Sequence, residues 1–289
     1  MRYNHKISYH LLTYFAKWLQ SRSIYKNRVL AQKISSIFYH YITIRKAEAE
    51  QNIVRAFPDK QIQLHTHILK KCYQFFTCNF IYFLTFPFSY FSASISIKSK
   101  TALDVANRQG KGVIIITGHV GAWEILSAWF GYNGYCLVGV AHQQNNQGSD
   151  TFFKELRGMS GFEHIYRKEP IEKMYRVLNE GKMLGLVSDQ DAKTNGVFID
   201  FLNHPASTPK GAALFHLKTK APMVFVSCME QAPNNYEVNC EKVISKSGDS
   251  VKDITQRYST MLEETIKQHP EQYFWWHRRW KTKPVKKNG

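Results

Sequence analysis

His119 and Glu124 are the residues whose types and spacing best fit acid–base chemistry. They follow a short β-branched run, residues 112–117, through a turn that contains Gly118 and Gly121. The glycines allow a sharp turn, which places His119 at the carboxyl edge of a sheet and Glu124 in the first turns of the next helix. A carboxylate on one imidazole nitrogen fixes the tautomer and leaves the other nitrogen as a general base. Because no serine or cysteine occupies a nucleophile elbow here, the pattern predicts proton removal from a bound substrate hydroxyl. The alternative is an incidental His–Glu pair beside a turn.

Helical and β-branched segments alternate from residue 98 onward. This alternation predicts an α/β fold class, with a mostly parallel central sheet flanked by helices. Predicted strands are 112–117, 135–141, 183–188, 223–228 and, at an edge of the sheet, 236–243. Predicted helices are 98–109, 122–130, 150–159, 169–180, 209–220 and 251–269. Residues 1–95 are predicted to be helical, with breaks near Ser21, Pro58 and Pro87.

Four sequence blocks in order carry a family resemblance. The H-x4-[D/E] spacing of His119 and Glu124 resembles the lysophospholipid-acyltransferase superfamily. The other blocks are Asp189-Gln190-Asp191 followed by residues 196–201, Ala206-Ser207-Thr208-Pro209-Lys210-Gly211, and residues 273–282. Together they are similar to the bacterial lipid A biosynthesis (lauroyl/myristoyl) acyltransferases, over most of residues 45–284. Lys193 and Leu202-Asn203 depart from the family pattern, which bears on acyl length and acceptor preference.

The resemblance implies transfer of a fatty acyl group from acyl carrier protein to a hydroxyl of a lipid A precursor. His119 and Glu124 would be the catalytic dyad, and the alkoxide would attack the thioester without an acyl-enzyme. Amides near Gly121 and Ala122, or Arg167, would stabilise the oxyanion. No cofactor is implied.

Five further residues are candidates for substrate binding. Arg157 and Arg167 fall where the family carries arginines, and either cation suits an acceptor phosphate or an oxyanion. The alternative for them is an ion pair with Glu155 or Glu169. Asp189 and Asp191 close a buried strand, so at least one is expected to face the cleft, and no spacing for a metal site accompanies them. Lys210 follows Thr208 and Pro209, which are typical of a helix N-cap and first helical residue. The free amides of such a helix start, together with Lys210, could bind a phosphate. The alternative is an ordinary capped helix without a ligand.

Charge and apolar pattern predict contact with a membrane surface. Residues 1–100 carry 15 Lys/Arg against 3 Asp/Glu, and residues 277–289 carry 6 against none, around a middle of net −1. Apolar residues recur at helical spacing within 1–22, and the charge-free segment 72–97 is dense in aromatic side chains. No stretch reads as a spanning helix or a signal peptide. We therefore expect residues 1–97 to form a helical, basic and aromatic membrane-associating region and residues 98–289 an α/β acyltransferase domain. The expected location is the cytoplasmic face of the inner membrane.

Composition limits the other classes of function. With 44% hydrophobic and 21% charged residues the chain is not disordered. Five cysteines without a CxxC pair argue against a disulfide scaffold or zinc module and fit a reducing compartment. Two alternatives remain. One is an acyltransferase for a glycolipid, ornithine lipid or lysophospholipid. The other is a non-enzymatic protein that binds nucleic acid or a membrane and uses residues 275–281 as an aromatic and basic stripe. We expect no nucleic acid among the partners.

Overall fold

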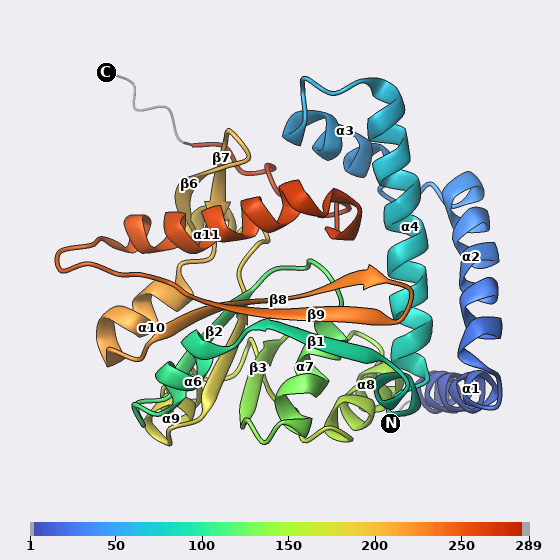
Figure 1. Cartoon of the computed structure of the whole chain (residues 1–289), viewed down its shortest axis with the longest axis horizontal. Helices are drawn as coiled ribbons and strands as arrows, with labels where there is room; N and C mark the ends of the chain where they lie inside the picture. The colour runs from blue at the N-terminus through green and yellow to red at the C-terminus, as the bar shows by residue number, and fades with distance from the viewer. Residues whose placement is uncertain (1–2, 285–289) are drawn as a thin grey trace.

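A seven-stranded, mostly parallel sheet forms the centre of the computed structural model, which describes residues 3–284 (Figure 1). The strand order within those residues is β1-β9-β8-β2-β5-β3-β4, and β8 with β9 is the antiparallel pair. The strands are β1 (Ser94–Ser99), β2 (Val113–Thr117), β3 (Leu137–Ala141), β4 (Glu163–Tyr166), β5 (Met183–Val187), β8 (Met223–Ala232) and β9 (Asn235–Lys242). A separate hairpin joins β6 (Val197–Phe201) to β7 (His204–Thr208). The predicted fold class, a mostly parallel sheet flanked by helices, is confirmed.

Helices cover both faces of the sheet, as the continuous apolar run of β2 requires. Ile114 and Ile116 of β2 belong to one core, while Val113 and Ile115 belong to the other. In Figure 1, α11 lies above the sheet and α7 lies below it. The helices of this part are α6 (Thr101–Asn107), α7 (Trp123–Tyr132), α8 (Gln147–Gly158), α9 (Glu172–Asn179), α10 (Gly211–Thr219) and α11 (Val251–Gln268).

Helices α1 to α5 share these cores instead of forming a separate one. They are α1 (Tyr3–Gln20), α2 (Ile24–Tyr41), α3 (Lys46–Ala56), α4 (Ile62–Leu84) and α5 (Phe88–Phe91). Helix α4 contributes Leu69 to one core and Leu84 to the other, and it stands beside the carboxyl end of β8 in Figure 1. The expected domain boundary after residue 97 falls inside β1. Much of segment 72–97 is core, since most of the α4 side chains from Cys72 onward are buried.

Sequence analysis missed strands β1, β4, β6 and β7 and misplaced β9. Residues 98–109 were expected to be one helix, but β1 runs through Ser99 and pairs in parallel with β9. Strand β9 therefore lies inside the sheet, and β1 and β4 are its edges. Edge strands of four to six residues carry too short a pattern to separate them from loops. No described helix is long and apolar enough to cross a membrane.

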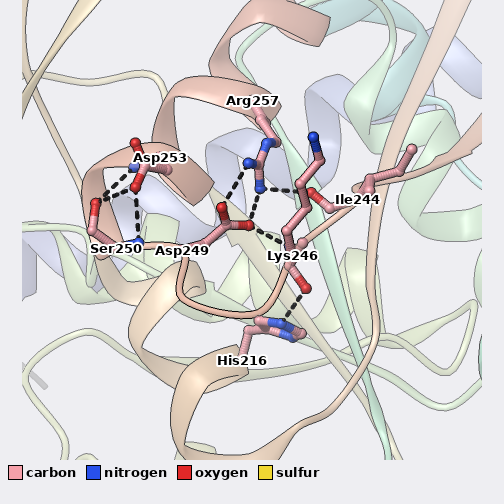
Figure 2. Close-up of polar contacts among 8 residues, drawn as sticks. His216, Ile244, Lys246, Asp249, Ser250, Asp253 and Arg257 are labelled. Carbon is pink, nitrogen blue, oxygen red and sulfur yellow. Dashed lines mark hydrogen bonds and ion pairs between the residues drawn. The ribbon is translucent and has the colours of Figure 1, made fainter.

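The loop between β9 and α11 is held by polar contacts (Figure 2). Asp249 accepts hydrogen bonds from the Arg257 guanidinium, and Ser250 with Asp253 forms a capping box at the start of α11. A second contact joins His216 of α10 to Ser245, 2.7 Å apart. These contacts fix the start of α11, which covers one face of the sheet.

Candidate active site

The turn after β2 presents His119 at the carboxyl edge of the sheet. Gly121 makes this turn possible: its φ is +63°, and a Cβ there would lie 2.1 Å from the carbonyl oxygen of Cys228. The amide of Ala122 donates to the same oxygen at 2.7 Å, and that of Gly121 donates to Gln272 at 2.8 Å. The expected oxyanion donors at Gly121 and Ala122 are therefore wrong, because both amides already bond backbone carbonyls.

His119 is held by Asp189, not by Glu124. The carboxylate of Asp189 lies 2.8 Å from Nδ1 of His119 and also accepts the backbone N–H of His119 at 2.9 Å. The Asp189 side chain is fully buried, whereas 25% of the His119 side chain is exposed. Burial opposes ionisation of Asp189, but the charge of His119 and the bonds that it donates outweigh burial and hold the Asp189 pKa well below its usual range. An ionised Asp189 fixes the Nδ1–H tautomer of His119 and leaves Nε2 as the basic nitrogen.

Glu124 belongs to a different contact. Both of its oxygens bond Arg157 of α8, at 2.9 Å from Nε and 2.6 Å from Nη2. The expected His119–Glu124 contact is therefore wrong, as are the alternative ion pairs of Arg157 with Glu155 and of Arg167 with Glu169. Burial works against the charge on Arg157, but Glu124 outweighs it and raises the Arg157 pKa. This pair joins the first turn of α7 to α8 and fixes the helix that follows His119.

A second histidine, which sequence analysis did not single out as a site residue, stands against the first. The rings of His119 and His277 are 4.6 Å apart and perpendicular. Gln190 lies 3.0 Å from Nε2 of His277 and 3.4 Å from Nε2 of His119. Burial lowers the pKa of His277 to about 4, so its ring is neutral at pH 7. The sequence feature that could have identified His277 is its place in the block 273–282. No local sequence pattern linked that block to the turn after β2.

The carboxyl-terminal segment packs onto the catalytic turn. Phe274 donates its backbone N–H to the carbonyl of His119 at 2.9 Å, and Asn52 of α3 donates to the carbonyl of His277 at 2.6 Å. Trp275, Arg279 and Trp280 are buried, with 1%, 1% and 4% exposure. Trp275, Arg279 and Trp280 therefore cannot contribute to an exposed stripe, whereas Arg278 and Lys281 of the same run are exposed. Residues 285–289 of the basic tail lie outside the described residues.

Arg279 also explains why the expected start of α10 is wrong. Its guanidinium donates to the hydroxyl of Thr208 at 2.6 Å and to the carbonyl of Ser207 at 2.8 Å. Thr208 therefore ends β7, and α10 begins at Gly211 without a side-chain cap. Lys210 is exposed at that helix start and makes no bond to the catalytic residues within the described part of the chain.

A polar pocket of about 600 Å³ lies at the carboxyl edge of the sheet, among residues that end or follow β3, β4 and β5. Arg167 and Asp191 line it, as do Lys168, Lys193 and several amide side chains that follow β3. Asp191 is two residues beyond Asp189, and its carboxylate accepts a bond from Thr282 at 2.8 Å. The structure thus places Arg167 and Asp191 in one pocket at the same edge of the sheet as His119, which is not among the lining residues. It places Arg157 in its bond to Glu124.

Half-buried aromatic side chains form the other surroundings of His119. The ring of Trp123 is 5.5 Å from that of His119, and the ring of Phe274 is 6.3 Å away. Phe76 of α4 contacts both, at 5.6 and 5.3 Å. The catalytic nitrogen is therefore next to an apolar surface, and the polar pocket lies at the same edge of the sheet.

His119, Asp189 and His277 offer ligand atoms within 4.8 Å of one another, the one such cluster of three among the described residues. Both Asp189 oxygens accept bonds from His119. A metal ion on Asp189 would have to displace these bonds, so the arrangement fits a hydrogen-bonded base better than an open metal site.

Comparison with known proteins gives the family of the chain. The family model for bacterial lipid A biosynthesis acyltransferases matches residues 6–282. The chain belongs to this family. Similar proteins include the phosphatidylinositol mannoside acyltransferase of Mycobacterium tuberculosis (strain CDC 1551 / Oshkosh), 23% identical over 61% of this chain, and that of Mycolicibacterium smegmatis, 23% identical over 58%. Each match spans 55% of the relative's length, so this lipid A acyltransferase family member aligns with about half of each curated relative.

Proposed function

We propose that the protein transfers a fatty acyl group from the thioester of acyl carrier protein to a hydroxyl of a lipid A precursor. The observation that carries the proposal is the buried Asp189 on Nδ1 of a His119 whose side chain is one quarter exposed. A base oriented in this way, beside a polar and an apolar surface, suits removal of a proton from a lipid hydroxyl.

The reaction needs no acyl-enzyme. Nε2 of His119 removes the proton of the acceptor hydroxyl, and the oxygen attacks the thioester carbonyl. The C–S bond then breaks, and the departing thiolate takes the proton from the imidazolium. Asp189 stabilises that imidazolium, and Arg167 is the remaining candidate among the expected donors for the oxyanion.

The polar pocket supports a phosphorylated, sugar-bearing acceptor. Arg167, Lys168 and Lys193 supply positive charge, and the amide side chains after β3 can hydrogen-bond hydroxyl groups. The aromatic surface formed by Phe76, Trp123 and Phe274 suits the apolar acyl chain. A second candidate acceptor is a phosphatidylinositol mannoside-like glycolipid, which the printed names of the relatives favour.

The proposed location is the cytoplasmic face of the inner membrane. Support comes from α1, which buries Leu19 against the protein while Leu11 and Tyr14 are 64% and 69% exposed. An exposed apolar face on a helix without acidic residues suits a bilayer interface.

Mass spectrometry of lipids from a deletion strain tests the proposal. Loss of one acyl chain from lipid A, restored by the wild-type gene and not by His119→Ala, is the expected result. A change confined to another glycolipid would assign the second acceptor, and unchanged lipids would refute acyl transfer. Assays with purified protein that offer the acyl group on carrier protein or on coenzyme A would identify the donor.

A further inference from the structure

A small groove lies at the start of α2, next to the end of α1. Figure 1 shows these two helices at the right-hand edge of the molecule. The volume of the groove is about 210 Å³, and its lining is Arg22, Tyr25, Lys26, Val29, Leu30 and Lys33. These residues follow helical spacing on the side of α2 that does not pack on α4. The groove is therefore a surface feature of α2 and takes no part in the catalytic site.

The cations of this groove have no carboxylate partner among the described residues. Arg28, on the same helix, does have one, because it bonds Glu230 of β8 at 3.2 Å. Arg22 donates instead to the side-chain oxygen of Asn27. The first acidic residue of the chain is Glu48, so α1 and α2 carry positive charge alone. Positive charge without compensation favours an anionic ligand.

The groove is continuous with the apolar face of α1. The Arg22 guanidinium lies 4.4 Å from the centroid of the Trp18 ring, and Trp18 stacks with Phe15. The exposed side chains along this face are Ile7, Leu11, Tyr14, Phe15 and Trp18. Cations beside exposed aliphatic and aromatic groups match the boundary between lipid headgroups and acyl chains.

We propose that this groove binds the phosphate of an anionic phospholipid headgroup in the bilayer on which α1 lies. The inference rests on the proposed membrane location and adds a headgroup site to it. Lys26 and Lys33 are exposed and about two helical turns apart on one side of α2, so both can reach one headgroup region while Trp18 enters the interface. The amino-terminal end of the 18-residue helix α2 adds its dipole to the same positive region.

Vesicle co-sedimentation of the full chain tests the site. Wild type is compared with Lys26→Gln/Lys33→Gln on neutral phosphatidylcholine vesicles and on vesicles that also contain phosphatidylglycerol. Two control variants remove the same charge: Lys6→Gln/Lys17→Gln from α1, and Lys242→Gln/Lys252→Gln from β9 and α11. The end of β9 and the start of α11 lie on the opposite side of the molecule from α2 (Figure 1).

We expect the Lys26/Lys33 variant to bind anionic vesicles about 25-fold more weakly than wild type, or about fivefold for each lysine, with binding to neutral vesicles unchanged. The Lys6/Lys17 variant should lose less, and the Lys242/Lys252 variant should match wild type. If the Lys26/Lys33 and Lys6/Lys17 variants lost equal affinity for anionic vesicles, the proposed headgroup site would be refuted. Diffuse attraction between the basic helices and the membrane would explain the binding instead. If inorganic phosphate released the wild-type protein from anionic vesicles more than chloride at equal ionic strength, the groove would be assigned to free phosphate instead of a lipid headgroup. Wild type that binds neither vesicle would refute the membrane location itself.

Discussion

His119 and Asp189 each stand two residues beyond one register pair of the sheet, Thr117 of β2 opposite Val187 of β5. Parallel strands in register carry their following residues to the same edge. The imidazole and the buried carboxylate therefore meet at 2.8 Å although 70 residues separate them in sequence. This strand pairing, and not the helix that follows His119, orients the catalytic base.

Asp189→Asn should lower kcat by about 10³- to 10⁴-fold, because an amide can neither enforce the Nδ1–H tautomer of His119 nor stabilise the imidazolium. His119→Ala should cost about 10²- to 10⁴-fold by removing the base. Asp59→Asn is the control, since Asp59 is exposed in the turn between α3 and α4. Steady-state kinetics with circular dichroism of each variant provides the measurement. An Asp189→Asn enzyme with near-wild-type kcat would refute this orientation of the base.

Glu124→Gln should destabilise the protein by about 1–3 kcal/mol, because it leaves the guanidinium of Arg157 without its counter-charge. Arg157→Gln should cost a similar amount, and the double variant should cost less than the sum of the two. Urea unfolding of the three variants measures this coupling. If Glu124 instead paired with His119 during catalysis, Glu124→Gln would lower kcat much more than Arg157→Gln, with no coupling in stability.

The half-buried His277 should make stability fall in mild acid. Its pKa is about 4 in the folded protein, below the ordinary histidine value of ~6.5, so the unfolded chain binds a proton first as the pH falls. Its stabilising contribution is complete above pH ~6.5 and is lost progressively down to pH ~4, with about 2 kcal/mol gone at pH 5. His277→Gln should flatten this part of the unfolding free-energy profile, and exposed His142→Gln should not. Parallel profiles for all three proteins would contradict the assignment.

Gly148→Ala should loosen α1. A Cβ at this position would lie 1.8 Å from the carbonyl oxygen of His5, whereas a Cβ at Gly158, on the same helix, meets nothing within 4 Å. The contact of Tyr9 with Glu155 at 2.7 Å would weaken as α1 shifts. We expect faster tryptic cleavage after Lys17 and a lower Tm for Gly148→Ala, but not for Gly158→Ala. Equal cleavage of the two variants would show that α1 is not held through this contact.

Arg167→Ala should raise KM for a phosphorylated acceptor by about tenfold to hundredfold if its guanidinium bonds the phosphate. If Arg167 also stabilises the oxyanion, kcat should fall by about 10²-fold. The melting temperature should not change, because the Arg167 side chain is exposed in the pocket. Lys182→Ala removes an exposed cation that pairs with Glu180 and is the matched control. Unchanged kinetics for Arg167→Ala would place this arginine outside substrate binding.

The alternation of helices with the main buried strands, and the place of His119 after one of those strands, were predictable from the sequence. These features depend on local patterns: the apolar run of β2 must be covered on both faces, and the glycines after it permit the turn. Asp191 could be proposed on the same ground, since it follows a predicted strand, whereas Arg167 was a candidate through the family resemblance because β4 was not predicted. Glu124 was the nearest carboxylate in sequence, and local spacing could not show that α8 brings Arg157 to it.

Tertiary structure decided which groups meet. The partner of His119 depends on β2 pairing with β5, and the approach of His277 depends on the carboxyl-terminal segment pairing with the catalytic turn. Both are contacts between segments far apart in the chain, and their free energy comes from packing that no local pattern records. Asp189 can be ionised in a fully buried position only because His119 donates two bonds to it. The fold class therefore follows from periodicity along the chain, whereas the catalytic pair follows from strand order.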